Sequence, residues 1–476
     1  MSQPAGPAPM SQLIPISEPP GEAGPLRGSH WLTGMLFDPT GRVFYHEGSI
    51  YRSIYPSATA RVRGMFQSGL IRELIERGLL IPTELTDIEV PDGGVILHHQ
   101  RVPFLTMGYE WSRPQLRDAA LAWLDLNLAL APHGLATIDA YWGNFAQTKL
   151  CQPTWIDFGS IVELKCGDQG LTEFCRYYRN PLLLATRSSG LARLTRAVNQ
   201  TGGLNDYELS SLAFAMAPFG GRKLQNCFDR LKRGWRRLRA RFGATARPGP
   251  EKRAELLRRL RDEIGGLRFP EMGTPWGDYH PSALFQDADS LPPDTRRSAV
   301  LATLDRLRPR RVIDLASNAG FYSFYAARLG ADVLAVDHDE KAIERLYTFA
   351  RTCARPLSVT CACGDVMRPP HERTSLRREA DLVLALALTH HLTLSQGFSF
   401  PSVLDTLARH TTDKLLVEFM PHGLGGTAPK PHPLPAWYRR EHFEQELSAR
   451  FHRVSIVTEN QLPQWRVLYL AEGKVS

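Results

Sequence analysis

The chain has 476 residues, 43% hydrophobic and 22% charged, which are proportions typical of a globular protein with room for at least two domains. No stretch approaches the roughly 20 apolar residues of a membrane-spanning helix, and the N-terminal residues lack the pattern of a secretion signal. Seven cysteines, an odd number, argue against a disulfide framework. We therefore expect a cytoplasmic protein.

The first half of the chain reads as a mixture of strands and helices behind a tail. Residues 1–28 are rich in Pro, Gly and Ser and predict disorder. A hairpin is expected over residues 42–52, with its turn at Glu47 and Gly48. Helical spacing of apolar residues and short β-rich runs then predict further elements. These are helices over 66–79, 115–131 and 171–200, and strands over 144–150 and 153–156.

The net charge of +8 is concentrated in one segment. Residues 222–261 hold 15 Lys and Arg against three acidic residues, a net charge of +12, which leaves −4 for the rest of the chain. Residues 222–242 predict a basic amphipathic helix. We interpret it as a packed helix with a solvated basic face, and the alternative is a surface that binds RNA.

A helical linker over 246–278, with a helix predicted from 251 to 267, separates two expected domains. These are an N-terminal domain over 29–245, which includes the basic helix, and a C-terminal domain over 279–476. The C-terminal domain alternates strand and helix, which predicts a doubly wound α/β fold with a parallel sheet. A strand over 311–315 leads into a turn of small residues, a helix over 321–329 and a second strand over 332–337.

This order resembles the class I S-adenosylmethionine-dependent methyltransferases, whose domain is a seven-stranded Rossmann-like sheet. The resemblance covers residues 275–473. It extends through a fourth strand at 381–386, a fifth at 414–419, a helix at 438–451 and a closing antiparallel pair at 453–457 and 466–471. The nearest alternative is a nicotinamide-dinucleotide fold, which the missing three-glycine fingerprint disfavours.

The resemblance implies an S-adenosylmethionine site with these cofactor-binding residues: Asp314, Ala316, Asn318, Gly320, Asp337, His338, Asp365, Val366 and Leu386. Asp337 ends the second strand, where such folds place the carboxylate that binds the ribose hydroxyls. Family members usually have Gly at the positions of Ala316 and Asn318. Asn tolerates left-handed backbone angles better than most residues, so we expect the turn to survive.

Three residues are candidates for catalysis. His390 and His391 follow the fourth strand, and a neutral imidazole can accept a proton near pH 7. Either one could be a general base, or both could simply pack against the ligand or the core, since adjacent residues of a strand face opposite sides. Glu418, at the end of the fifth strand, is a candidate for orienting the acceptor. We expect no metal in this half.

A second group of residues lies in the N-terminal half. Asp139, Asn144 and Asp157 resemble the catalytic loop and magnesium-binding segment of the protein-kinase superfamily. That resemblance implies an α+β kinase-like domain, with Asn144 and Asp157 as candidate magnesium ligands for Mg-ATP. Two features of that superfamily are missing from the sequence. The glycine-rich loop is unrecognisable, and the nucleotide-binding lysine is absent, since no Lys occurs before Lys149.

Taken together, the two halves resemble the nodulation-protein-related methyltransferases, on motifs such as Tyr109–Ser112, Ala140–Asn144 and Ala385–Leu392. The leading hypothesis is a methyltransferase acting on a small-molecule, secondary-metabolite or glycan acceptor, which the kinase-like half binds or presents. One alternative is a bifunctional kinase–methyltransferase. Another is an RNA-binding or RNA-modifying methyltransferase that uses residues 222–261.

Overall fold

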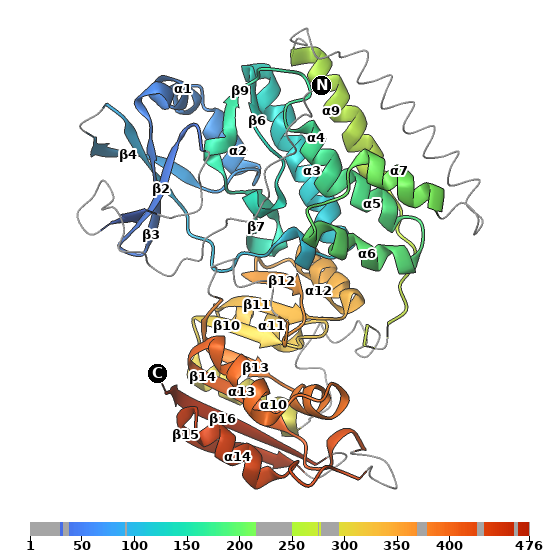
Figure 1. Ribbon diagram of the computed structural model, residues 1–476. Coiled ribbons are helices and arrows are strands. Elements are labelled where there is room, and N and C mark those ends of the chain that lie inside the picture. The colour runs from blue at the N-terminus through green and yellow to red at the C-terminus, as the bar shows by residue number, and fades with distance from the viewer. Residues whose placement is uncertain are drawn as a thin grey trace, which may run out of the picture. The chain divides into compact units, whose positions relative to one another are not determined.

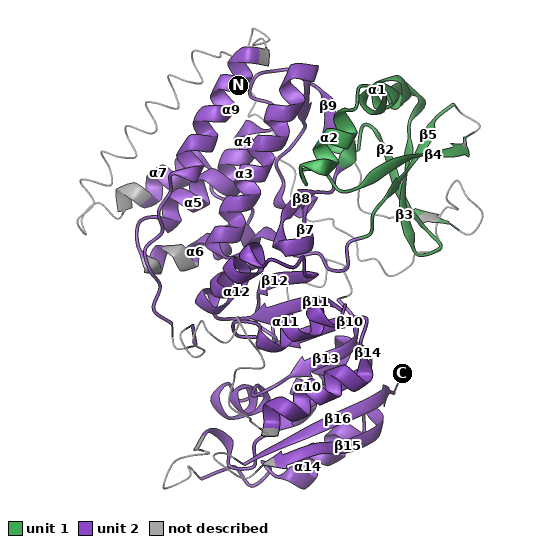
Figure 2. Ribbon diagram, turned by 180° about the vertical axis from the view of Figure 1, so that it is seen from behind, with its two compact units in different colours: residues 1–101, 158–160, 369–377 green, residues 102–157, 161–368, 378–476 purple. Residues whose placement is uncertain are grey.

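A computed structural model describes most of the chain in two compact units. The described residues are 29–31, 38–90, 93–215, 250–274, 276–277, 295–368, 378–425, 433–460 and 465–475. Unit 1 comprises residues 1–101, 158–160 and 369–377, and unit 2 comprises the remainder (Figure 2). The predicted tail and the predicted basic helix over 222–242 lie outside the described residues.

Unit 1 is built on a five-stranded antiparallel sheet in the order β1-β2-β3-β5-β4. Its strands are β1 (His30–Trp31), β2 (Gly41–His46), β3 (Ser49–Ile54), β4 (Thr83–Glu89) and β5 (Val95–His99). The predicted hairpin is confirmed: β2 pairs with β3 around Glu47 and Gly48, both at positive φ. The predicted helix over 66–79 is wrong at its start. Gly69, at φ 78°, separates α1 (Pro56–Gln67) from α2 (Leu70–Glu76).

Unit 2 begins with a helical part centred on α3 (Arg113–Leu130), the helix predicted over 115–131. Ser112 and Gln115 form a capping box at its start. The single helix predicted over 171–200 is wrong, because the helical stretch contains a π-helical turn at Cys175–Arg179 and ends at Ala185, and a new helix begins at Ser189. The other elements of this part are α4 (Leu171–Phe174), α5 (Asn180–Ala185), α6 (Ser189–Gln200), α7 (Asp206–Ala215), α9 (Pro250–Gly265), β6 (Leu135–Thr137), β7 (Phe145–Gln147), β8 (Pro153–Trp155) and β9 (Ile161–Glu163).

Helix α9 packs along α3, although the sequence suggested a linker there (Figure 1). Its apolar stripe is buried, with Leu257 and Ile264 fully inaccessible to solvent. Arg253 is also buried, and its guanidinium donates to the carbonyls of Gly167 and Gln169. A helix held by both apolar packing and buried hydrogen bonds is an integral part of this fold.

The rest of unit 2 contains a seven-stranded sheet in the order β12-β11-β10-β13-β14-β16-β15. The first five strands in that order are parallel, and β16 runs antiparallel to both β14 and β15, as predicted. The strands are β10 (Arg311–Leu315), β11 (Asp332–Asp337), β12 (Val359–Cys363), β13 (Ala380–Ala385), β14 (Thr411–Phe419), β15 (Phe451–Asn460) and β16 (Arg466–Lys474). The α/β fold with a parallel sheet is therefore confirmed.

Helices cover both faces of this sheet because its central strands are apolar on both sides. Ile313 and Leu315 of β10 pack in one core with α13 (Phe400–Arg409) and α14 (Arg440–Ser448). The side chain of Val312 points to the other face of the sheet. It packs there in a second core with α10 (Thr295–Leu307), α11 (Phe321–Arg328) and α12 (Glu340–Thr352). The double coverage leaves the strand ends as the accessible places for a ligand.

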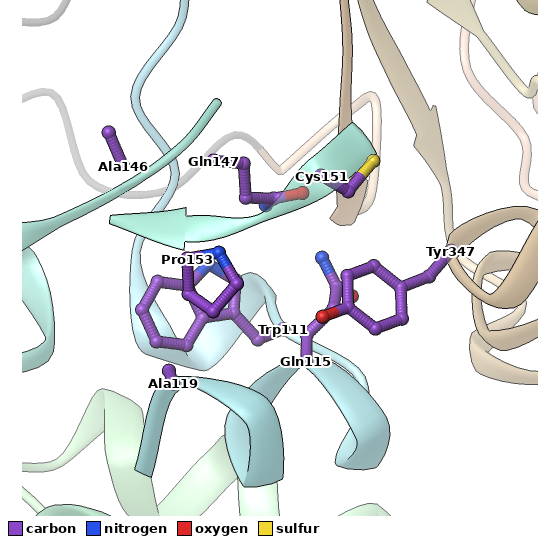
Figure 3. A pocket seen from close by; sticks show the side chains of 8 residues that line it. All are labelled: Trp111, Gln115, Ala119, Ala146, Gln147, Cys151, Pro153 and Tyr347. Atoms are coloured by element: carbon purple, nitrogen blue, oxygen red, sulfur yellow. The ribbon is translucent and has the colours of Figure 1, made fainter. Parts of the chain in front are cut away.

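The outer edge of β12, which has no neighbouring strand among the described residues, is covered by side chains and backbone of the helical part. Alternate carbonyls along this edge each accept a hydrogen bond: Leu357 from the Leu150 amide (3.2 Å), Val359 from the Cys151 thiol (2.9 Å), Cys361 from Gln147 (2.8 Å) and Gln115 (2.9 Å), and Cys363 from Arg196 (2.7 Å). Gln147 also accepts from the Cys361 amide at 3.0 Å, so one side chain replaces a neighbouring strand. Figure 3 shows Gln115 and Gln147 beside a small pocket at this junction.

Candidate functional site

The turn after β10 brings the predicted cofactor loop against the end of β11. The Ser317 amide donates to the Val336 carbonyl at 3.0 Å, and the Asn318 amide donates to Oδ2 of Asp337 at 2.7 Å. Oδ1 of Asp337 accepts from the Asp339 amide at 2.8 Å. These contacts place the loop and the Asp337 carboxylate side by side at the carboxyl edge of the sheet.

The loop adopts left-handed backbone angles at Ala316 (φ 64°), Asn318 (φ 49°) and Gly320 (φ 88°). Asn318 therefore occupies the conformation expected from its tolerance of these angles. Ala316 has no such tolerance, and its conformation costs about 1 kcal/mol. Strain of this kind persists only where surrounding contacts hold the backbone, as they do here.

Two carboxylates of this loop region are buried. Burial raises the pKa of Asp314 to about 7, with a further increase from Asp337, against a hydrogen bond from the Ser323 hydroxyl at 2.6 Å. Burial also raises the pKa of Asp337, which backbone amides of Asp339 and Asn318 partly offset. The hydrogen bond from Ser323 thus ties the start of α11 (Phe321–Arg328) to Asp314 of β10, and the backbone amides of Asn318 and Asp339 hold the carboxylate of Asp337.

The other predicted cofactor residues lie around the same edge. The Gly364 amide donates to the Asp337 carbonyl at 2.9 Å, so the turn after β12 is fixed to the end of β11. Asp365 follows, and its Oδ1 accepts from the Met367 amide at 3.0 Å. Val366 and Leu386 are buried apolar residues, whereas the side chain of His338 is 68% exposed. These residues thus follow the carboxyl ends of β11, β12 and β13.

His390 and His391 lie in a helical turn after β13, not in a strand, so the expectation that they face opposite sides is wrong. Their ring centroids are 4.2 Å apart. Burial, with His391, Arg466 and Arg296, lowers the pKa of His390 to about 3. Burial and His338 lower the pKa of His391. Both rings are therefore neutral at pH 7, and His390 is a weak base.

Trp276 connects the histidines to the cofactor loop. Its ring packs edge-on against His391, with centroids 5.3 Å apart. Its carbonyl accepts from the Asn318 side chain at 2.9 Å, and its amide donates to Asp339 at 3.3 Å. The signal for Trp276 in the sequence is its place just before the first strand of the sheet.

Glu418 is fully buried at the end of β14, where it binds two arginines. Its carboxylate accepts from Arg296 at 2.6 and 3.2 Å and from Arg466 at 3.0 Å. The Ala387 amide donates to it at 2.8 Å. Sequence reasoning missed both arginines, because each is brought to Glu418 from a distant part of the chain and carries no local motif.

The predicted kinase-like residues also come together within unit 2. The Asn144 side chain donates to Asp139 at 2.9 Å. Burial, with the nearby charges of Asp157 and Glu173, raises the pKa of Asp139 to about 7. Tyr141 lies close by and packs against Tyr177, with centroids 5.7 Å apart. The carboxyl group of Asp139 thus lies close to the Asn144 amide and to the aromatic ring of Tyr141.

The described residues hold neither a candidate metal site nor a membrane-spanning helix. Within the described ranges, no group of three or more His, Cys, Asp or Glu side chains is placed to hold a metal ion. Across those same residues, no helix has the length and hydropathy needed to cross a bilayer. The small pocket of Figure 3 contains none of the predicted cofactor-binding or catalytic residues.

Comparisons with known proteins give one clear relative. The chain is 26% identical over 427 residues to Nodulation protein NoeA of Rhizobium meliloti (strain 1021), spanning 82% of this chain and 85% of that one. No protein-family model matches.

Solved structures give weaker similarities, with TM-scores of about 0.3. Magnesium protoporphyrin IX methyltransferase (ChlM) from Synechocystis PCC 6803 is 18% identical over 39% of this chain and 89% of its own, with a TM-score of 0.29. The bifunctional kinase-methyltransferase WbdD is 20% identical over 42% of each chain, with a TM-score of 0.30. At these scores we draw no argument from them.

Proposed function

We propose that this protein is an S-adenosylmethionine-dependent methyltransferase whose acceptor is a small molecule or a glycan. The observation that carries the proposal is the strained loop over 316–320 bound through its backbone to the carboxylate of Asp337. A Rossmann-like sheet with a closing antiparallel strand supports the same conclusion. So does the similarity to a nodulation protein along most of the chain.

The residues at the sheet edge suit the cofactor. A carboxylate has about four lone-pair directions, and backbone amides occupy two on Asp337, so hydroxyl groups of a ribose can bind the others. Oδ1 of Asn318 is buried and has no hydrogen-bond partner among the described residues, which provides a further acceptor. Val366 and Leu386 offer apolar surface to an adenine ring.

S-adenosylmethionine, when bound, supplies an electrophilic methyl group on a sulfonium. The chain's own contribution is then chiefly to hold the acceptor in line with that methyl group, since positioning lowers the barrier most. His390 is a poor general base, because a group with a pKa of about 3 gives little driving force for removing a proton at pH 7. We infer that His390 and His391 position the acceptor.

The N-terminal half, in this proposal, binds or presents the acceptor. Asp139, Asn144 and Asp157 form a polar group with aromatic neighbours, which suits hydroxylated ligands. Phosphotransfer requires a cation on the nucleotide phosphates, yet no Lys occurs before Lys149. Arg52, Arg61 or Arg63 could replace the charge of that lysine but not its geometry, and Arg52 is 1% exposed and ion-paired with Asp38. The Mg-ATP site of a kinase would therefore lack its lysine here.

A kinase activity remains the second candidate, because the raised pKa of Asp139 suits a residue that accepts a proton from a hydroxyl group. Calorimetric titration with S-adenosylmethionine and, separately, with Mg-ATP tests both candidates. We expect the sulfonium cofactor to bind and Mg-ATP not to bind. Failure of the sulfonium cofactor to bind would overturn the main proposal.

A further inference from the structure

A pair of arginines lies at the carboxyl edge of the sheet, fixed by the buried carboxylate of Glu418. Arg296 lies at the start of α10 and Arg466 at the start of β16. Both side chains keep part of their surface, at 20% and 17% exposure, while Glu418 has none. Because Glu418 also accepts from the Ala387 amide, the two guanidinium groups are held next to the turn that follows β13.

The imidazole of His390 interacts electrostatically with this pair of arginines. His390 is only 5% exposed, and its Nδ1 has no hydrogen-bond partner among the described residues. Burial is the main reason why the pKa of His390 is low, and His391, Arg466 and Arg296 lower it further. A buried, unpartnered polar atom thus lies within electrostatic range of the arginine pair. A buried nitrogen without a protein partner can take a hydrogen bond from a bound ligand or a water.

We propose that Arg296 and Arg466 form a subsite for an oxyanion, a carboxylate or a phosphate, carried by the methyl acceptor. This inference rests on the proposed function, since it assigns a chemical class to the acceptor of the same site. Guanidinium groups bind planar carboxylates and phosphates through paired hydrogen bonds, and a lysine would not reproduce that geometry. The role of Glu418 is then to hold both arginines in position.

The position of the subsite relative to the cofactor loop supports this assignment. His391 lies beside His390 and packs against Trp276, whose carbonyl accepts from Asn318 in the loop. A chain of contacts thus runs from His390 to the loop. An acceptor anchored by its oxyanion at the arginines would lie at the same edge of the sheet as the cofactor.

The test uses the full-length protein and three small probes of similar size: phenyl phosphate, benzoate and benzyl alcohol. Isothermal titration is carried out with S-adenosylmethionine already bound. We expect at least one anion to bind and the neutral alcohol not to bind, and comparison of the two anions identifies which oxyanion is preferred. Equal binding of the alcohol would overturn the inference.

Two substitutions with opposite expected signs separate an electrostatic subsite from general damage. Arg466→Gln should weaken binding of the anion about tenfold or more, because one charge-assisted contact is lost. Glu418→Gln should strengthen it, since the competing carboxylate is neutralised while an oxygen acceptor remains. Arg297→Gln, beside the pair but against Phe321, is the matched control and should leave binding unchanged.

If Arg466→Gln fails to fold, Arg466→Lys replaces it, and binding should weaken because the fork geometry is lost while the charge remains. Unchanged anion binding in both Arg466→Lys and Glu418→Gln would overturn the inference. Titration with S-adenosylmethionine in the same samples keeps the two proposals distinguishable. Cofactor binding without anion binding contradicts only the subsite, whereas loss of both contradicts the proposed function.

Discussion

The contact of Gln147 with β12 allows a quantitative prediction. The Gln147 amide donates to the Cys361 carbonyl at 2.8 Å and accepts from the Cys361 amide at 3.0 Å. Gln147→Met keeps nearly the same side-chain volume but removes these two hydrogen bonds and a third, which the Gln147 amide donates to the Thr106 hydroxyl at 2.9 Å. That hydroxyl keeps its bond from the Trp111 indole at 2.9 Å. The Cys361 carbonyl keeps its bond from Gln115 at 2.9 Å, whereas its amide, buried at the sheet edge, loses the acceptor that Gln147 provides.

The expected loss of stability follows from the difference between the Cys361 amide, which loses its acceptor, and the Cys361 carbonyl, which keeps a donor. A buried N–H left without an acceptor costs about 1–3 kcal/mol, while the carbonyl that keeps a partner costs little. We therefore expect Gln147→Met to lower the free energy of unfolding of unit 2 by about 2 kcal/mol. Gln200→Met, on the exposed end of α6, is the matched control and should change it by less than about 0.5 kcal/mol.

Urea unfolding, followed by tryptophan fluorescence and by circular dichroism, measures this difference. Coincidence of the two probes is needed first, because a chain of this size can unfold in more than one step. A lower midpoint with an unchanged slope is the expected result. If Gln147→Met unfolds at the same urea concentration as the Gln200→Met control, the edge contact does not stabilise unit 2 and the reasoning is refuted.

Three further predictions concern the cofactor edge, a buried acid and the N-terminal group. Arg196→Gln should weaken S-adenosylmethionine binding several-fold in calorimetry, because Arg196 holds the Cys363 carbonyl just before the turn at Gly364; an unchanged affinity would contradict this. Burial raises the pKa of Glu340 to about 7, so its ionisation removes stability as pH rises from about 4.5 to 7. Glu340→Gln should therefore stabilise the protein more at pH 8 than at pH 5, by up to about 3 kcal/mol in urea unfolding, and equal effects at both pH values would refute it. Finally, wild-type protein should not bind millimolar Mg-ATP; binding that is lost in Asp157→Ala would instead support the kinase candidate.

Much of the C-terminal sheet could be predicted because its strands and helices alternate along the chain and each has a local sequence pattern. Short apolar strands alternate with helices, and small residues and Asp337 mark two successive strand ends. The same reasoning failed where long-range contacts decide the outcome. His390 and His391 belong to a helical turn, which strand periodicity could not reveal, and the break between Ala185 and Ser189 was hidden by continuous apolar spacing.

The candidate site was only partly predictable for the same physical reason. The cofactor loop is a contiguous stretch of sequence, so a resemblance to a known family could predict its residues. Arg296 and Arg466 meet at Glu418 from positions 170 residues apart, and an isolated arginine looks the same whether it is solvated or buried. The hydrogen bonds at the edge of β12 could not be predicted either, since Gln147 and Cys361 are brought together only by the folding of unit 2.

Binding of S-adenosylmethionine by wild-type protein and by Asp337→Ala, measured by calorimetry, tests the central claim most directly. Circular dichroism of both proteins first shows that the substitution leaves the fold intact, and Asp337→Asn serves as a variant that keeps the side-chain shape. We predict saturable binding to the wild type, weaker binding to Asp337→Asn and none to Asp337→Ala. Absence of binding to the folded wild type, or equal binding to all three proteins, would contradict the account.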